Sequence, residues 1–171
     1  LAVQARSSDD VEVSREMRQT MERQVEHLVR LVDDLLDVSR LTTGQITLRR
    51  QPVDVRDIVA DALDTCREIV DTRRHRVTTR FPSAAAGALL VNGDRIRLVQ
   101  VVTNILNNAA KFTEPGGEIA IDACARDGAF EICVRDNGIG ISADRLPRIF
   151  DLFFQSDQSP DRAKGGLGVG L

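Results

Sequence analysis

The sequence predicts an α+β fold, a two-layer α/β sandwich with helices on one face of a mixed sheet, preceded by a long bundle-forming helix. Apolar residues recur with helical spacing from about residue 14 to residue 40. Two later segments each carry one apolar helical face, and two apolar–polar alternations flank Asp127-Gly128, which is typical of a hairpin. We therefore expect a helical arm over residues 1–43 and a second domain over residues 44–171.

Composition excludes several classes of protein. The chain has 171 residues, a formal net charge of -3 and 42% hydrophobic residues, which suits one domain with an appendage. The small negative net charge does not favour binding to a polyanion, so nucleic-acid binding is not expected. No apolar run is long enough to cross a bilayer, so we expect any membrane attachment to lie outside this sequence. The three cysteines lack metal spacing or an obvious pairing, which fits a reduced, cytoplasmic compartment.

The helical arm carries a heptad seam. Met21, Val25, Leu28, Val32 and Leu35 lie at alternating spacings of four and three residues. A long helix with one apolar stripe is not stable alone, and the rest of the sequence offers no second long helix of that kind. We therefore expect the arm to form a homodimer.

Capping and turn residues set the element boundaries of the second domain. Asp54 and Asp94 are good N-caps, each at the start of an amphipathic helix, and the second helix is expected to end near Ala110. A short helix is expected over residues 142–150. Strands are expected, in chain order, at residues 46–52, 75–81, 89–91, 119–123 and 130–134.

The helix after Asp94 has a polar stripe formed by Arg97, Asn104, Asn108 and Lys111, at spacings of seven, four and three residues. A polar stripe is usually a solvated face, but asparagine is a poor helix former for that purpose. Carboxamide oxygens suit Mg²⁺, and a lysine one turn further on suits a phosphate. The two interpretations are equally open from these residues alone. The opposite, core-facing stripe is expected to contain Leu98, Val101, Val102, Ile105 and Ala109.

The segment Asp136-Asn137-Gly138-Ile139-Gly140 follows an alternating strand, so its carboxylate is expected to point past the edge of the sheet. An aspartate there can accept a hydrogen bond from the exocyclic amine of adenine, which guanine does not offer at that place. The glycines allow a ring to lie close to the backbone. A plain turn after a strand is the alternative interpretation.

A second glycine-rich segment covers residues 164–170, with Leu167 and Val169 between its glycines. This differs from a Ser/Gly linker, and such a loop can present backbone N–H groups to phosphates where a helix begins. A flexible tail or a linker is the alternative. No Lys-Ser/Thr follows the last glycine, so it is not a Walker loop. Phe150 lies nearby, and core packing is the commoner role for such a residue.

The histidines receive structural interpretations. The basic run at residues 73–76, which contains His75, is interpreted as a solvated strand entrance rather than a phosphate-binding patch. His27 follows Glu26 on the long helix, which raises the hypothesis of a phosphate acceptor. An ordinary position on a helix face is the stronger interpretation.

Four segments, in order, resemble sequence boxes of the sensor histidine kinases, including the hybrid type. Residues 104–113 resemble the N box, 136–140 the first glycine box, 148–155 the F box and 166–171 the second glycine box. Residues 31–40 are similar to part of the second helix of the family's dimerisation and phosphotransfer domain. The resemblance covers essentially the whole chain, and four boxes in order are far more specific than any one.

The resemblance implies an ATP-dependent protein histidine kinase of two-component signal transduction, with ATP and Mg²⁺ as cofactors. The γ-phosphoryl group would pass to a histidine and then to an aspartate in the receiver domain of a response regulator. Asn108 would hold Mg²⁺ with Asn104 in support. Lys111 would contact phosphate and Asp136 the adenine amine. The nucleotide-binding set is completed by Gly138, Gly140, Phe150, Lys164, Gly166, Gly168 and Gly170.

The sequence departs from the family pattern in two places. The acceptor motif of the Ser-His-Glu-Leu-Arg type is absent, and His27 lacks the Glu-Leu-Arg that should follow. We therefore expect the acceptor histidine outside this fragment and no autophosphorylation by the fragment. We also expect the parent chain to continue beyond Leu171 with an apolar helix and at least one strand.

Two alternatives remain. One is another ATPase of the gyrase, heat-shock-90, histidine kinase and MutL superfamily, which the helix at residues 31–40 argues against. The other is a non-catalytic nucleotide-binding dimerisation module.

Overall fold

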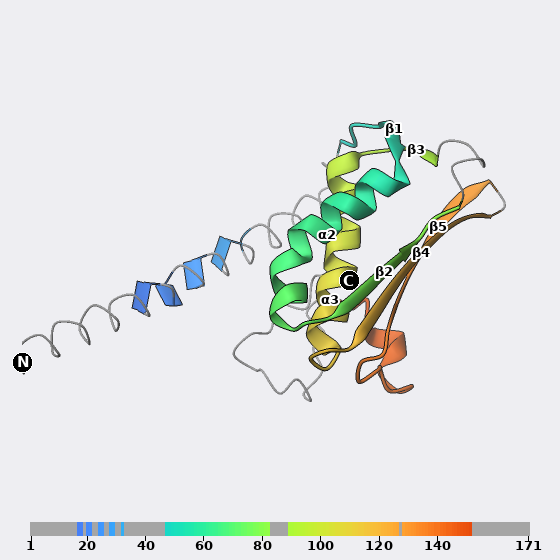
Figure 1. Ribbon diagram of the computed structural model, residues 1–171. Helices are drawn as coiled ribbons and strands as arrows, with labels where there is room; N and C mark the ends of the chain where they lie inside the picture. The colour runs from blue at the N-terminus through green and yellow to red at the C-terminus, as the bar shows by residue number, and fades with distance from the viewer. Residues whose placement is uncertain are drawn as a thin grey trace, which may run out of the picture. The chain divides into compact units, whose positions relative to one another are not determined.

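The structure is a computed structural model. The residues that it describes are 17, 18, 20, 21, 24, 25, 28, 29, 32, 47–82, 89–126 and 128–151. Those up to residue 32 belong to one compact unit and those from 47 to 151 to another, and each unit is described by itself (Figure 1).

The described residues of the first unit are all helical and exposed. The predicted helix is therefore confirmed at these positions, whereas Leu35 lies outside the described residues. The large apolar side chains exposed on this helix are Met17, Met21, Val25, Leu28, Val29 and Val32.

The described residues of the second unit form two small sheets. Strand β1 (Gln51–Asp54) pairs antiparallel with β3 (Leu90–Gly93). Strand β4 (Glu118–Arg126) lies between β2 (Arg76–Arg80), its parallel neighbour, and β5 (Ala129–Asp136), its antiparallel neighbour. The mixed sheet is thus confirmed. The first strand begins later than predicted, because Val53, buried in the core, pairs with Val91 whereas Leu48 is exposed.

Two helices cover one face of the three-stranded sheet (Figure 1). Helix α2 (Val55–Thr72) begins at Asp54, whose carboxylate accepts a hydrogen bond from the backbone N–H of Arg56. Helix α3 (Arg95–Phe112) begins at Asp94, whose carboxylate accepts from the N–H groups of Ile96 and Arg97. Both predicted N-caps are confirmed, because each carboxylate satisfies donors that the first turn of a helix leaves free.

The core lies between these helices and the sheet. Alternate residues of β4 face it, as the hairpin pattern predicts, and β5 turns Ile132 and Val134 to the same side. The buried residues of the main cluster are Val53, Ile58, Val59, Ala62, Cys66, Val102, Leu106, Ala109, Ala110, Ile119 and Ile121.

The predicted core stripe of α3 is wrong at two positions. Val101 is 55% exposed and Ile105 37% exposed, whereas Leu106, which the prediction omitted, is buried. At about 100° per residue the buried stripe runs through Val102, Leu106 and Ala109, so Val101 and Ile105 lie on its flank. There they line an apolar hollow together with residues of β3 and β5.

After β5 the chain forms turns and a short 3₁₀ helix, η2 (Leu146–Arg148), instead of the helix predicted over residues 142–150. Pro147 lacks a backbone donor and so limits helix growth at this place. Phe150 is 72% exposed, so the expected core packing of this side chain is wrong.

Candidate functional site

The polar stripe of α3 is half-buried. Asn104, Asn108 and Lys111 are all partly covered, and no hydrogen bond joins the side-chain amide of Asn104 or Asn108 to another described residue. The intervening Asn107 differs, because its carbonyl oxygen accepts a hydrogen bond from the Cys66 thiol on α2, with an Sγ–Oδ1 distance of 3.4 Å. Asn107 therefore belongs to the helix–helix contact, whereas the side-chain amides of Asn104 and Asn108 make no such contact within the described part of the chain.

Asp136 ends β5 on the same face of the sheet as the core. Its register partner is Ile119, which is buried beneath the helices, so the Asp136 side chain leaves the strand on the helix side. The carboxylate oxygen Oδ1 accepts a hydrogen bond from the backbone N–H of Gly138 at 2.9 Å. This bond fixes the carboxylate at the mouth of the loop while the group remains exposed.

The loop after β5 lies against the C-terminal end of α3. The backbone N–H of Ile139 donates to the carbonyl oxygen of Phe112 at 3.1 Å. Gly138 fits there because it has no side chain: a Cβ at this residue would lie 2.4 Å from the same carbonyl oxygen. Gly140 is needed for a different reason, since its φ of 69° lies in the left-handed region. The fold thus brings the loop of Asp136 to the residue that follows Lys111.

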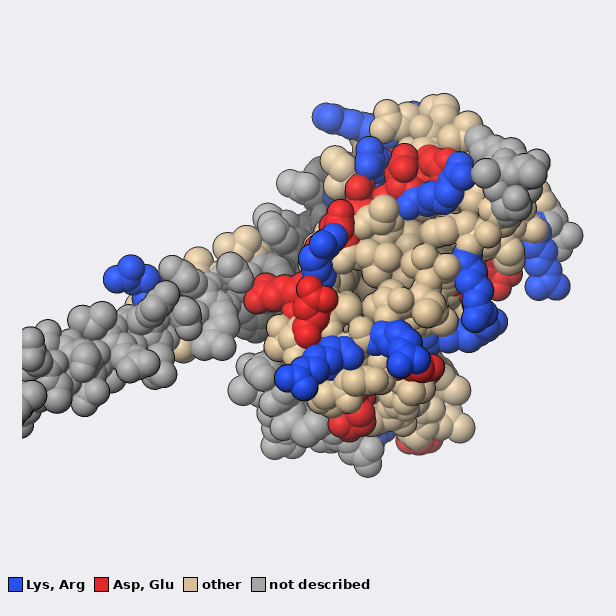
Figure 2. Space-filling view, in the orientation of Figure 1, with Lys and Arg blue, Asp and Glu red and all other residues tan. Residues whose placement is uncertain are grey.

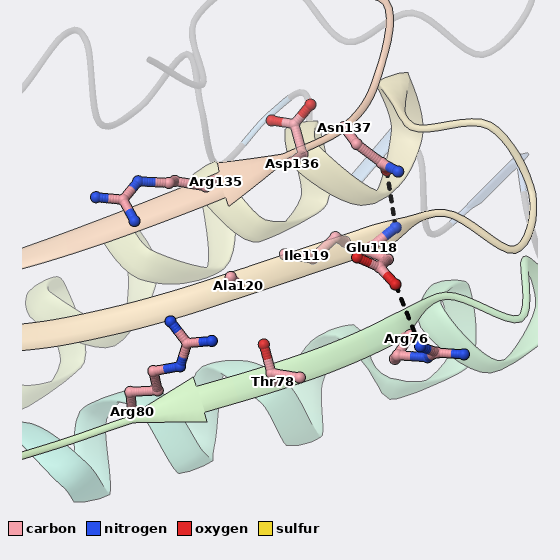
Figure 3. Close-up of a pocket in the computed structure, with 9 residues that line it drawn as sticks. All are labelled: Arg76, Thr78, Arg80, Glu118, Ile119, Ala120, Arg135, Asp136 and Asn137. Carbon is pink, nitrogen blue, oxygen red and sulfur yellow. Dashed lines mark hydrogen bonds and ion pairs between the residues drawn. The ribbon is translucent and has the colours of Figure 1, made fainter.

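Asn137 is a structural residue of the site that the sequence interpretation missed. Its Oδ1 accepts a hydrogen bond from the backbone N–H of Glu118 at 2.8 Å, and its own N–H donates to the Glu118 carbonyl (Figure 3). Asn137 therefore joins the end of β5 to the start of β4. The signal was present, because asparagine next to glycine favours a turn closed by its own side chain.

The face of the sheet turned away from the helices has a shallow hollow of about 420 Å³, whose lining extends to Asp136 and Asn137. Arg76 and Arg80 reach it from β2, and Arg135 from β5 (Figure 3). Arg80 and Arg135 both pair with Asp122, at 4.0 Å and 3.2 Å. On the face drawn in Figure 2, basic and acidic side chains are similarly interspersed rather than gathered into one basic stripe.

Two carboxylates that cap the helices have lowered pKa values. Hydrogen bonds from Arg56 hold the pKa of Asp54 below its usual range, and the backbone N–H of Arg49 does the same for the pKa of Asp94. Burial raises the pKa of the Cys66 thiol, which keeps it protonated against α3. These groups support the helices beneath the site and do not face the loop of Asp136.

Several predicted site residues cannot be placed. Lys164, Gly166, Gly168 and Gly170 lie outside the described residues, as does His27. Among the residues that the structure does describe, no three His, Cys, Asp or Glu side chains form a group that could hold a metal ion.

Comparison with known proteins identifies a family and several relatives that resemble this chain. Residues 93–171 match the family described as histidine kinase-, DNA gyrase B-, and HSP90-like ATPase. The chain is 37% identical over 146 residues to the histidine protein kinase DivJ of Caulobacter vibrioides, covering 85% of this chain and 24% of that protein. It is 32% identical over 165 residues to the sensor-like histidine kinase SenX3 of Mycolicibacterium smegmatis, covering 96% of this chain and 42% of that protein.

The chain contains the ATP-binding catalytic domain of the sensor histidine kinases. It spans only about a quarter to two-fifths of the length of these two relatives. Full-length ShkA in complex with AMPPNP is similar in structure, with a TM-score of 0.70 and 30% identity over 84% of this chain and 29% of that one.

The fold alone is shared with the histidine kinase AdeS of Acinetobacter baumannii, with a TM-score of 0.69 and 24% identity over 88% of this chain and 67% of that one. Within the described part of this chain, no helix combines the length and apolar character that a membrane span requires.

Proposed function

We propose that this histidine kinase domain binds Mg·ATP at the junction of α3 and the loop after β5 and delivers the γ-phosphoryl group to a histidine. The supporting observation is the hydrogen bond from Ile139 to Phe112, which brings Asp136 and the α3 stripe to one place. The Gly138 N–H donates to Oδ1 of Asp136, so the other carboxylate oxygen, Oδ2, would accept a hydrogen bond from the adenine amine. Adenine selectivity then follows, since guanine presents a carbonyl oxygen there.

The amide of Asn108 fits Mg²⁺, because it is half-buried and not hydrogen-bonded to another described residue. A single carboxamide oxygen is a sufficient protein ligand for Mg²⁺, since this ion takes most of its ligands from phosphate and water. The ion would offset negative charge on the phosphates during transfer. Asn104 lies one turn away on the same stripe and would support Asn108. Lys111 would bind phosphate at the helix end.

The glycines of the second glycine box and Lys164 would cover the phosphates, as the family pattern implies. We propose that the acceptor histidine lies outside this sequence, because neither His27 nor His75 has the acceptor context. The phosphoryl group would then pass to the aspartate of a receiver domain. ThkA, a fold relative with a TM-score of 0.62, is known in complex with the response regulator protein TrrA.

We further propose that the domain boundary lies near residue 43 and that the arm before it forms a homodimer. The supporting observation is the row of exposed apolar side chains on the described helical positions, which includes Val25, Leu28 and Val32. Val32→Asp should shift a dimer to monomer in sedimentation equilibrium, because it puts a carboxylate into an apolar contact. A wild-type chain that stays monomeric at all concentrations would exclude this interface.

The nucleotide site is tested by thermal unfolding with and without Mg·ATP. Ligand that binds only the folded state raises the melting temperature, so the wild type should be stabilised and Asp136→Asn should not be. Asp64→Asn is a matched control, because this exposed carboxylate pairs with Arg67 within α2. Equal stabilisation of the wild type and Asp136→Asn would contradict the proposed role of Asp136.

A non-catalytic nucleotide-binding module is the remaining alternative. A longer form of the protein that contains the acceptor helix should incorporate label from γ-phosphate-labelled ATP on a histidine. The present chain should not label His27.

A further inference from the structure

The C-terminal end of α3 is held by groups from distant parts of the chain. The last four carbonyl groups of a helix have no partner within it. In α3 the carbonyl of Ala109 accepts from the backbone N–H of Thr113, and that of Phe112 accepts from Ile139. The carbonyls of Ala110 and Lys111 are instead bound by side chains from the turn after α2.

These two side chains are Arg73 and His75. The His75 ring nitrogen Nε2 lies 2.9 Å from the carbonyl oxygen of Ala110 and must donate, because a carbonyl oxygen can only accept. Arg73 donates through Nη1 to the carbonyl oxygens of Lys111 at 3.1 Å and Thr113 at 3.3 Å. Arg73 is half-buried and His75 only 8% exposed. The interpretation of residues 73–76 as a solvated strand entrance is therefore wrong at these two residues.

The turn itself is fixed at both ends. Its N–H groups bond back to α2, including His75 to the carbonyl of Val70, and Arg74 adopts a left-handed φ of 56°. The loop after α3 is tied to the same turn, because Gly116 donates to the carbonyl of Arg73 and Arg76 donates to that of Gly117. The donors thus lie on a turn that backbone hydrogen bonds join both to α2 and to the loop after α3.

We propose that Arg73 and His75 are positioning residues of the nucleotide site. Arg73 binds the carbonyls of Lys111 and Thr113 on either side of Phe112, and His75 binds that of Ala110. The carbonyl of Phe112 in turn accepts from Ile139 in the loop of Asp136. A shift of the carbonyls that Arg73 and His75 bind would therefore also shift the bond between Ile139 and Phe112. Lys111 lies on the helical turn that carries all of these carbonyls. A guanidinium at this end also suits the negative end of the helix dipole. The expected effect on nucleotide binding rests on the proposed function, whereas the expected effect of Arg73 and His75 on the position of the loop does not.

Hydrogen exchange of backbone amides tests the positioning directly, without nucleotide. Arg73→Met removes both donated bonds and keeps the apolar stem of the side chain. Exchange at Ile139 and at the last turn of α3 should become about tenfold faster, the effect of losing roughly one charge-assisted hydrogen bond. Exchange at Val102 and Leu106 in the helix core should not change. Arg73→Lys, which keeps a donor, should restore most of the protection.

Arg76→Met is the matched control, since Arg76 belongs to the same basic run but is exposed and pairs only with Glu118 among the described side chains. It should leave exchange at Ile139 unchanged. Unchanged exchange at Ile139 in Arg73→Met, or an equal rise throughout α2, α3 and the sheet, would overturn the proposal. The second result would mean that Arg73 contributes only to general stability.

Titration with Mg·ATP tests the effect of Arg73 on nucleotide binding. Arg73→Met should bind about tenfold more weakly than the wild type, with Arg73→Lys and Arg76→Met close to the wild type. A wild type that binds no nucleotide would contradict the proposed function, while the exchange experiment would still decide the role of Arg73. Wild-type affinity in Arg73→Met would overturn the effect on nucleotide.

Discussion

Gly138→Ala should disrupt the contact between the loop after β5 and the C-terminal end of α3. The added Cβ would lie 2.4 Å from the carbonyl oxygen of Phe112 and 2.8 Å from its carbonyl carbon. Both atoms are backbone at the end of α3, so neither can rotate away. The loop must move instead, which breaks the bond from Ile139 to Phe112.

Crowding of this kind costs about 1–3 kcal/mol and a lost backbone hydrogen bond about 0.5–1.5 kcal/mol, so unfolding should become easier by roughly 2–4 kcal/mol. Gly128→Ala is the control, because its φ of 78° is left-handed but nothing lies within 4 Å of the added Cβ. It should cost only about 1–2 kcal/mol for its backbone conformation.

Urea unfolding followed by circular dichroism gives the free energies by linear extrapolation. Gly138→Ala should also lose stabilisation by Mg·ATP, whereas Gly128→Ala, in the β4–β5 turn, should keep it. A Gly138→Ala variant no less stable than Gly128→Ala would refute the close contact between the loop and α3.

Three further outcomes follow from the structure. Arg74→Gly should raise the free energy of unfolding by about 0.5–1 kcal/mol in urea, because glycine adopts the left-handed φ of 56° without strain, although chain entropy removes part of the gain. The free energy of unfolding should decrease as the pH is lowered below about 4. The pKa values of Asp54 and Asp94 are lower in the folded state than in the unfolded state, so both carboxylates stabilise the fold above their unfolded pKa. This contribution is lost as the pH falls through their folded pKa values. In Asp54→Asn the melting temperature should decrease less steeply with falling pH. The same pH dependence in Asp54→Asn and the wild type would contradict the contribution of Asp54. Cys124, which is exposed, should be alkylated faster than Cys66, which is buried with a raised pKa, when labelling is followed by mass spectrometry at neutral pH.

Local patterns made much of the fold predictable. Both N-caps, the two helices and the hairpin about Gly128 depend on residues close in sequence, and the structure has all of them. The position of β1 was predicted too early because it depends on a distant strand. Val53 pairs with Val91 and Pro52 with Asn92, and no local pattern near residue 50 reveals that register.

The rest of the site depends on similar long-range contacts. Arg73 and Lys111 are 38 residues apart, and nothing in the run of basic residues indicates that a guanidinium in it caps a helix. The exposure of Val101 and Ile105 likewise depends on how α3 is rotated against the sheet. The loop after β5 was predictable as a turn with glycines, but its contact with Phe112 was not, because that contact needs β5 and α3 to be placed first.

We propose that nucleotide binds where α3 meets the loop after β5, on the helix side of the sheet. Amide chemical shifts recorded during titration with Mg·ADP test this location. Binding should shift the amides of Asn108, Lys111 and Gly138 and leave those of Thr78 and Ala120, which line the hollow on the opposite face, nearly unchanged. Shifts confined to Thr78, Ala120 and their neighbours would contradict the account.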